Sequence, residues 1–227
     1  MPKLLDQEGL AGALGALPLF QGLRSDLRRD LSRRAVWREY HPGEFVFIEG
    51  NESPGLFYLE SGWLKVVKSS LQGREQVLRF VGPGETFNEV GVFAGRPNPA
   101  TAIALETSGV WLLPRSELSR LLREHPEFAE STIGQMADRL THLVGLVADL
   151  SLRTVTGRLA RLLLDDSVDG VLFRPRWFTL AELASRLGTV PDVIQRAVAA
   201  LASEGVIDVR RSEFRIRDRA RLEELAD

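Results

Sequence analysis

Apolar residues in the first half of the chain cluster in short runs rich in β-branched and aromatic side chains. Between about Leu19 and Pro114 these runs read FVFIEG, LFYLESG, WLKVVKSS, EQVLRFVG, TAIALET and GVWLLP, and glycines recur between them. Short apolar runs separated by turn residues are typical of a small antiparallel sandwich or barrel. The pattern predicts a jelly-roll-like domain with a hairpin tip at Gln72-Gly73.

The periodicity becomes helical after this region. Pro126, with Glu127 and Glu130 nearby, suits the first turn of a helix that continues to about Leu152. Its apolar residues step by three and four positions, the spacing of a two-stranded coiled-coil seam. An amphipathic helix lying on its own domain would show a wider apolar stripe. We therefore expect a dimer interface at Ile133, Met136, Leu140, Leu143, Val147 and Leu150.

Two shorter helices are predicted between Phe178 and Ile207. Thr179 and Glu182 are spaced as a capping box, which starts a helix at Leu180. Gly188 can adopt the left-handed backbone of a tight turn, so the first helix ends there. A second helix begins near Thr189 to Pro191 and runs to about Ser203. Two short helices around a glycine are common in helical domains, but the spacing also fits a helix-turn-helix.

The second of these helices has one apolar and one polar face. Ile194, Ala197, Val198 and Leu201 share the first face, and Asp192, Gln195, Arg196 and Ala199 share the second, which is small enough to enter a major groove. The following segment alternates apolar and polar residues on both sides of Arg210-Arg211-Ser212-Glu213, which predicts a hairpin. A helix-turn-helix followed by a basic hairpin is a winged helix.

Composition excludes several kinds of site. The chain has 227 residues and no cysteine, so it can form no disulfide, thiolate nucleophile or cysteine-ligated iron–sulfur cluster. No window approaches eighteen apolar residues and no signal peptide is recognisable, which predicts a soluble, cytoplasmic protein without membrane contact. The apolar fraction of 44% is sufficient for folded cores.

The charge pattern adds weak support for local DNA binding. The net charge is −2, whereas a chain that coats nucleic acid indiscriminately would be basic overall. Residues 171–217 hold eight arginines against five acids, a net of +3. Arginine makes up 26 of the 29 basic residues of the whole chain, so no single arginine argues for a phosphate contact.

The order of these parts resembles the CRP/FNR family of bacterial transcription regulators, named for the cyclic-AMP receptor protein and the fumarate-nitrate reductase regulator. The most specific pieces are GETFNEVGVFAG (84–95), which is similar to the family's phosphate-binding cassette, QMADRL (135–140) with VTGRLARLLL (155–164), and the helix-turn-helix. The resemblance covers roughly residues 18–220.

This resemblance implies an α+β fold with three parts. Residues 1–125 would form a β-roll effector domain of the cyclic-nucleotide-binding type, and 126–152 the dimerisation helix. Residues 153–227 would form the winged helix-turn-helix DNA-binding domain. The implied partners are a second copy of the chain, double-stranded DNA with a palindromic site, and RNA polymerase.

The cassette departs from the pattern of members that bind cyclic AMP. Those members carry a glycine-glutamate pair and then an arginine-serine pair that holds the cyclic phosphate. Here the first pair is Asn88-Glu89 and the second is Asn98-Pro99, which offers neither a positive charge nor a second amide donor. The adenine-contacting hydroxyl pair falls on the apolar Leu143 and Val144. These departures argue against cyclic AMP as the effector.

Other effectors of the family also find little support. Iron–sulfur sensing requires cysteines, and the histidines His41, His125 and His142 are scattered. Val90 stands where carbon-monoxide sensors have a haem-ligating histidine, although Pro2 resembles the proline ligand of those sensors. Three options stay open: a small anion or lipid-like ligand, a haem bound differently, or no effector. The candidate pocket residues are Asn88, Glu89, Val90, Asn98, Pro99, Thr101, Leu143 and Val144.

The recognition helix departs as well. Members that read TGTGA-like half-sites have arginine, glutamate and arginine at positions that are Pro191, Asp192 and Arg196 here. Arg196 can bind guanine in a bidentate manner and Asp192 can accept from cytosine, although an i,i+4 ion pair between them is the alternative. The residues expected to contact DNA are Thr179, Thr189, Asp192, Gln195, Arg196, Arg210 and Arg211.

Two functional hypotheses follow. The first is a homodimeric, sequence-specific transcription regulator, and the second is a ligand-binding sensor whose helix-turn-helix has become a protein-interaction surface. A cupin-type enzyme would need a histidine cluster with a carboxylate to hold a metal ion, which the sequence lacks. No catalytic or metal-binding residue is predicted.

Overall fold

The computed structural model describes residues 5–226, and Pro2 therefore lies outside the described residues. The chain forms two compact units. The first comprises the described residues up to Lys68 together with Arg79–His142, and the second comprises Ser69–Leu78 together with Leu143 onward. None of the described helices combines the length and apolar character needed to cross a membrane.

Eight strands form two four-stranded sheets. The first sheet has the order β1 (Val36–Tyr40), β8 (Ser108–Pro114), β3 (Gly55–Ser61) and β6 (Thr86–Phe87), with antiparallel pairings throughout. The second has the order β2 (Phe45–Phe47), β7 (Thr101–Ala104), β4 (Leu64–Ser69) and β5 (Glu75–Val81). The predicted β-roll is confirmed, and all six apolar runs contribute strands.

Strand β3 is buried on both faces, which explains its continuous apolar sequence. Side chains alternate between the two faces of a strand, so Phe57 and Leu59 point one way and Leu56 and Tyr58 the other. The first pair joins a core between the sheets, where Phe57 and Phe87 stack with ring centroids 5.2 Å apart. The second pair joins a core covered by helices.

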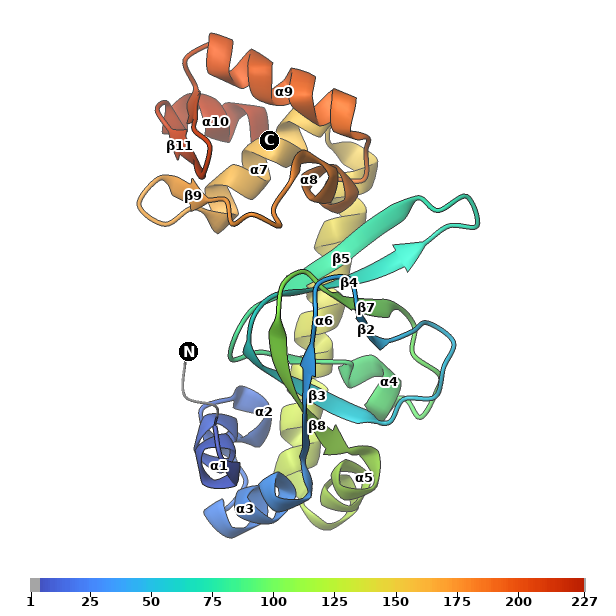
Figure 1. Cartoon of the computed structure of the whole chain (residues 1–227). Coiled ribbons are helices and arrows are strands. Elements are labelled where there is room, and N and C mark those ends of the chain that lie inside the picture. Colours follow the sequence, from blue (N-terminus) through green and yellow to red (C-terminus); the bar gives the residue numbers. More distant parts are fainter. Residues whose placement is uncertain (1–4, 227) are drawn as a thin grey trace. The chain divides into compact units, whose positions relative to one another are not determined.

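Three N-terminal helices supply much of this second core: α1 (Gln7–Gly15), α2 (Pro18–Gln21) and α3 (Ser25–Arg34) (Figure 1). The expectation that the strand pattern starts at about Leu19 was wrong, because residues 18–34 are mostly helical. Leu27 and Leu31 lie one helical turn apart and both are buried, a period of 3.6 rather than 2. The Asp6 carboxylate caps α1 by accepting from the Gly9 amide at 2.8 Å.

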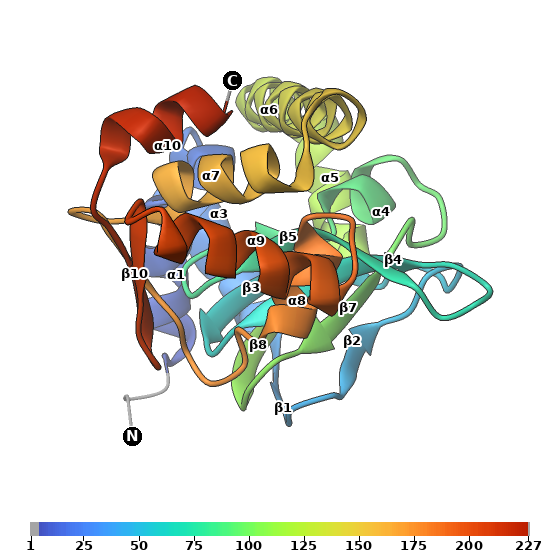
Figure 2. The same ribbon diagram turned by 90° about the horizontal axis from the view of Figure 1, so that it is seen from above.

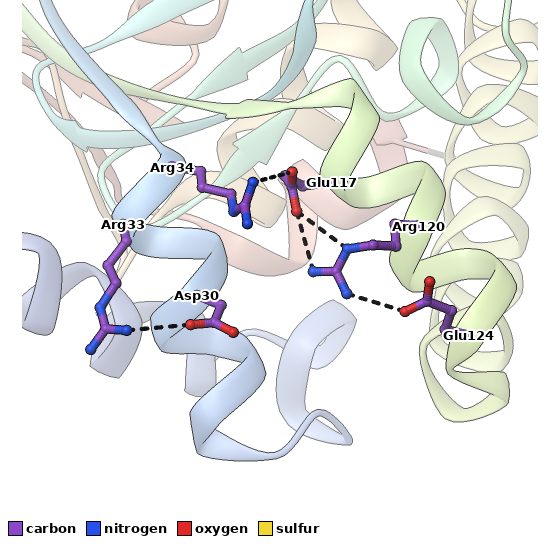
Figure 3. A network of polar contacts seen from close by, with 6 residues as sticks. All are labelled: Asp30, Arg33, Arg34, Glu117, Arg120 and Glu124. Atoms are coloured by element: carbon purple, nitrogen blue, oxygen red, sulfur yellow. Dashed lines mark hydrogen bonds and ion pairs between the residues drawn. The ribbon is translucent and has the colours of Figure 1, made fainter.

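An ion-pair network ties α3 to α5 (Arg115–Glu124) (Figure 3). The largely buried carboxylate of Glu117 accepts from Arg34 at 3.0 Å and from Arg120 at 3.2 Å. Arg120 also binds Glu124 at 3.1 Å, and these hydrogen bonds raise the pKa of its guanidinium. The network joins two helices whose positions in the sequence are about ninety residues apart, and so it fixes the helical cover of the β-roll.

The long helix α6 spans Pro126–Leu152, as predicted. Its first turns are anchored in the first unit, where Phe128 is fully buried and stacks on Phe20 with ring centroids 5.6 Å apart. Thr132 is also buried, and its hydroxyl donates to the Phe128 carbonyl. Beyond this point most of the apolar side chains of α6 are exposed.

The second unit contains the predicted helix-turn-helix and hairpin (Figure 2). Its helices are α7 (Val155–Asp166), α8 (Leu180–Arg186), α9 (Pro191–Ser203) and α10 (Arg219–Ala226). Its sheet has the order β10 (Ile207–Val209), β11 (Glu213–Ile216) and β9 (Val171–Phe173). Strand β9 adds a third strand to the predicted hairpin, and α10 packs on α7.

Candidate nucleic-acid interface and effector cassette

The start of α8 is fixed by its cap. The Thr179 hydroxyl accepts from the Glu182 amide at 3.2 Å, which is one half of the predicted capping box. The Thr179 amide donates to the Trp177 carbonyl at 2.8 Å, so the turn at Trp177 also contributes to the start of the helix. A bond from this amide to the Glu182 carboxylate stays a prediction.

The turn between α8 and α9 depends on Gly188. Its φ angle is +66°, in the left-handed region that side chains with a Cβ rarely adopt. Thr189, a predicted DNA contact, is half-buried, and its amide donates back to the Ala184 carbonyl at 2.9 Å. Helix α9 then starts at Pro191, which needs no amide partner at that position.

The two faces of α9 separate as the sequence predicts. Ile194, Ala197, Val198 and Leu201 are buried, whereas Asp192, Gln195, Arg196 and Ala199 are exposed. Within the described part of the chain no ion pair joins Asp192 to Arg196. The Arg196 Nε instead lies 3.4 Å from the backbone carbonyl of Asp192. Both charged groups are thus available to an external partner.

The wing presents further arginines. Arg211 is exposed at the tip, and Arg210 is exposed but paired with Glu213 at 3.3 Å. Sequence reasoning missed Arg174, whose amide donates to the Ser212 carbonyl at 2.7 Å and whose guanidinium lies 4.5 Å from the ring centroid of Phe214. Burial lowers the pKa of Arg174. This arginine stabilises the base of the wing, and the run RPRW before α8 is its only sequence signal.

The cassette begins at a residue with an unusual backbone. Asn88, which stands at the family's glycine position, has φ +77° and ψ +22°. Asparagine is one of the few residues other than glycine that occupy this left-handed region readily. Its side-chain nitrogen donates to the Ser53 hydroxyl at 2.9 Å and to the Gly55 carbonyl at 3.1 Å. The substitution thus preserves the backbone path and adds a side chain that points into the protein.

Glu89, at the start of α4 (Glu89–Phe93), is only 4% exposed. Its carboxylate accepts from the Thr86 hydroxyl at 3.0 Å and from Arg139 Nη2 at 3.2 Å. Burial raises the pKa of Glu89, and the charge of Arg79 opposes this shift. Neither Arg139 nor Gln135 was predicted as a site residue. Gln135 lies one helical turn from Arg139, and its side-chain amide is 3.4 Å from the Thr86 hydroxyl.

The positions of the family's arginine-serine pair have a structural role here. Asn98 is 2% exposed, and its side-chain nitrogen points to the Ile48 carbonyl at 3.3 Å. Its backbone also exchanges hydrogen bonds with Gly50 and Asn51. Pro99 is exposed and has no amide hydrogen. These two residues therefore close two loops on each other, and neither of them is a cation.

The remaining candidate pocket residues belong to two units: Val90 and Thr101 lie in the first, and Leu143 and Val144 lie in the second. Thr101 accepts from the Glu49 amide at 3.0 Å. Val90 is 43% exposed, and Leu143 and Val144 on α6 are 42% and 62% exposed. Gly91 is enclosed, since a Cβ there would lie 2.7 Å from Asn88 Oδ1 and 2.9 Å from Asn98 Oδ1. The described residues contain no group of three or more metal-ligating side chains.

The apolar seam of α6 is open to solvent in the single chain. Ile133, Leu140 and Val147 are 69%, 64% and 63% exposed, whereas Met136 and Leu150 are half-buried. Leu150 lies against the turn of its own helix-turn-helix, where its Cδ2 is 2.6 Å from the position of a Cβ on Gly188. Most of the seam is therefore exposed in the single chain, whereas its last residue, Leu150, packs within the chain.

Comparison with known proteins gives matches along most of the chain. Residues 37–125 match the family of cyclic nucleotide-binding domains, and residues 157–225 match the Crp-like helix-turn-helix domain. A protein of Thermus thermophilus named cyclic AMP receptor protein is 32% identical over 212 residues, which cover 92% of this chain and 96% of that protein. A CRP-like cAMP-activated global transcriptional regulator of Mycobacterium tuberculosis is 27% identical over 210 residues, covering 90% and 94%.

A solved structure agrees at the level of the fold. The structure of FixK2 from Bradyrhizobium japonicum superposes with a TM-score of 0.76 at 23% identity, and the match covers 85% of this chain and 98% of that one.

Proposed function

The chain belongs to the CRP/FNR family of transcription regulators, and from that premise we propose that it acts as a homodimer that binds palindromic DNA sequence-specifically without cyclic AMP. It is a regulator with a DNA-binding helix-turn-helix, not an enzyme. The observation that carries the proposal is the polar face of α9. Gln195 and Arg196 are exposed there while the opposite face is buried.

This face has the chemistry that base reading requires. The Arg196 guanidinium can make two hydrogen bonds to guanine O6 and N7, and the Asp192 carboxylate can accept from cytosine N4. Thr179, Thr189, Arg210 and Arg211 lie on the elements that flank α9, and we assign them to the phosphate backbone. Because Pro191 replaces an arginine of the TGTGA-reading members, we expect a different half-site.

Dimerisation through α6 is supported by its exposed apolar residues. A row of exposed Ile133, Leu140 and Val147 at coiled-coil spacing would be costly to leave in water. A two-fold dimer would place two recognition helices for the two halves of a palindrome. We assign residues 1–125 to an effector domain, 126–152 to the dimerisation helix and 153–227 to the DNA-binding domain. A cytoplasmic location and a contact with RNA polymerase follow from the family.

Three features of the cassette support the proposal that it does not bind cyclic AMP, although the names of two relatives mention that nucleotide. Asn98 points to the Ile48 carbonyl, and Pro99 offers no donor. The Glu89 carboxylate is already bonded to Arg139 and Thr86. Each hydrogen bond to a charged group that is missing removes about 1.5–3 kcal/mol of binding free energy. We therefore propose that cyclic AMP is not the effector.

Selection of bound sequences from a random DNA pool, followed by gel shifts at several salt concentrations, tests DNA binding. We expect a palindromic site, and a binding constant whose logarithm falls linearly with the logarithm of the salt concentration. Failure to enrich any sequence, together with capture of a protein partner by the polar face of α9, would favour the interaction-surface hypothesis instead.

Titration calorimetry with cyclic AMP tests the effector proposal. We expect no binding at micromolar concentrations, and a micromolar or tighter dissociation constant would refute the effector proposal.

Sedimentation of the wild-type protein tests the dimer proposal. A protein that sediments as a monomer at micromolar concentration would refute it.

A further inference from the structure

The tip of the hairpin between β4 and β5, residues Ser69–Leu78, belongs to the same compact unit as the helix-turn-helix. The tip is closed by its own hydrogen bonds. The Ser70 amide donates to the Arg74 carbonyl at 2.8 Å, and the Gly73 amide donates to the Ser70 carbonyl at 2.9 Å. Gly73 has a φ angle of +77°, as a tight turn requires. The side chains that follow the turn are therefore presented from an ordered backbone.

Two of these side chains bind the helix-turn-helix. Arg74 Nη2 donates to the Gly188 carbonyl at 2.8 Å, and Gln76 Nε2 donates to the Arg186 carbonyl at 3.0 Å. The partners are 114 and 110 residues apart in the sequence. Arg74 immediately precedes β5 and Gln76 lies within it, and both side chains donate to carbonyls at the end of α8 and in the turn that follows.

The two carbonyls bound by Arg74 and Gln76 lie at and just beyond the end of α8, where the helix supplies no amide donor. The last carbonyls of a helix have no intrahelical partner. In α8, the Leu183 and Ala184 carbonyls accept from the amides of Leu187 and Thr189. The Arg186 and Gly188 carbonyls receive side-chain donors from the hairpin tip. The positive charge of Arg74 also suits the negative end of the helix dipole.

The turn is enclosed by other parts of the unit as well. A Cβ on Gly188 would lie 2.6 Å from Leu150 Cδ2, 2.9 Å from Gln76 Oε1 and 3.3 Å from Arg158 Nη1. The end of α6, the start of α7 and the hairpin tip thus meet at one glycine. The hairpin tip is therefore in direct contact with the link between α8 and α9.

We propose that Arg74 and Gln76 are positioning residues for DNA recognition, which clamp the turn at Gly188 and so fix α9 relative to α8. This inference rests on the proposed function, because it gives the clamp a role in presenting Arg196 to DNA. It assigns to two residues of the hairpin tip a task that neither their sequence position nor the helix-turn-helix motif indicates.

The variants Arg74→Ala, Gln76→Ala and the double variant test the clamp in the full-length protein. Gln72→Ala is the matched control, because Gln72 is an exposed residue of the same tip. Hydrogen exchange without DNA should show faster exchange of the Leu187 and Thr189 amides. The loss of one net hydrogen bond, about 1 kcal/mol, corresponds to about a fivefold change in an equilibrium constant. We therefore expect these amides to exchange roughly fivefold faster in each single variant, and faster still in the double variant.

DNA binding provides the second readout. We expect the double variant to bind the selected site about tenfold more weakly, with non-specific binding unchanged, and we expect Arg74→Lys to recover part of the loss because it keeps a charged donor. Unchanged exchange at Leu187 and Thr189 would overturn the clamp. Tighter DNA binding by the double variant would overturn the positioning role, because the contact would then oppose recognition. The exchange result needs no DNA, so it stands even if the wild-type protein proves not to bind DNA.

Discussion

The cassette and the recognition helix differ in where their polar groups point. In the cassette, Asn88, Glu89 and Asn98 are all buried, and each donates to or accepts from another part of the first unit. On α9, Gln195 and Arg196 are exposed, and the Arg196 side chain has only a long contact with its own backbone. One set of groups stabilises the fold, and the other is available to a partner.

We propose that this difference reflects the loss of cyclic-AMP binding in a fold that keeps its DNA-binding helix-turn-helix. A buried polar group must be hydrogen-bonded, so replacing the ligand-binding residues of a cassette requires new internal partners. The Asn88–Ser53 and Asn98–Ile48 hydrogen bonds are such partners, at the two buried positions where the residue differs from the family's pattern. An exposed recognition face has no such constraint, and its residues can change with the DNA site.

The largest effect is expected at the seam that would pair two recognition helices. Leu140→Glu would bury a carboxylate against its twin in the dimer, at a cost of about 3–5 kcal/mol. Sedimentation should show a monomer, and binding to the palindromic site should fall with it. Ala137→Glu is the control, because Ala137 is exposed on α6 outside the seam. Equal dimerisation of the two variants would contradict the assigned interface.

The next largest effect concerns the recognition face. Arg196→Ala should weaken binding to the selected site by about 1–3 kcal/mol, with non-specific binding nearly intact. Arg211→Ala should weaken binding to all sequences similarly and lower the salt slope by about one, as expected for a phosphate contact. Fluorescence anisotropy on specific and scrambled DNA measures both. If Arg196→Ala weakened binding to specific and to scrambled DNA equally, Arg196 would be a phosphate contact and not a base reader.

The raised pKa of Glu89 predicts that the stability of the protein depends on pH. Burial raises its pKa, so the folded protein binds this proton more tightly than the unfolded chain does. The free energy of unfolding should therefore fall as pH rises from about 4.3, the unfolded value, through the raised folded pKa. The slope for one proton is at most about 1.4 kcal/mol per pH unit.

Urea unfolding of the wild type and of Glu89→Gln tests this pH dependence. The measurements should run from about pH 4.5, just above the unfolded pKa of glutamate, to about pH 8. The variant should lack the added slope, because its side chain does not ionise. Parallel pH profiles for the two proteins would mean that Glu89 does not titrate in this window.

The smallest effect is expected at the cap of α8. Thr179→Ala removes the acceptor of the Glu182 amide and should cost about 1 kcal/mol, whereas Thr179→Ser keeps the hydroxyl and should cost less. Hydrogen exchange of the α8 amides measures the loss locally. An alanine variant as protected as the serine variant would show that the turn at Trp177, not the hydroxyl, sets the start of the helix.

Local patterns predicted most of the fold. The six apolar runs became strands, and α6, α8 and α9 have the predicted starts because Pro126, Thr179 and Pro191 are strong local signals. The N-terminal helices were missed, since α2 has only four residues and α3 has few apolar ones. Strand β9 has three residues and gains its pairing only from β11, which is distant in the sequence.

The candidate sites were predictable only as far as they depend on single elements. The two faces of α9 follow from helical periodicity. The left-handed backbone of Asn88 was not predicted, although asparagine at a glycine position is compatible with it. The Glu89–Arg139 pair joins residues fifty positions apart, and the contacts of Arg74 and Gln76 span more than a hundred. No local pattern reports such pairings, because they depend on tertiary packing.

The most direct test of the whole account is the affinity of the full-length protein for its selected palindromic DNA site, measured by anisotropy with and without cyclic AMP at fixed salt. We expect specific binding in the absence of the nucleotide, typically in the 10⁻⁸–10⁻¹¹ M range, and no change when it is added. Specific binding that appears only with cyclic AMP would contradict the account, because the cassette would then be a working nucleotide site.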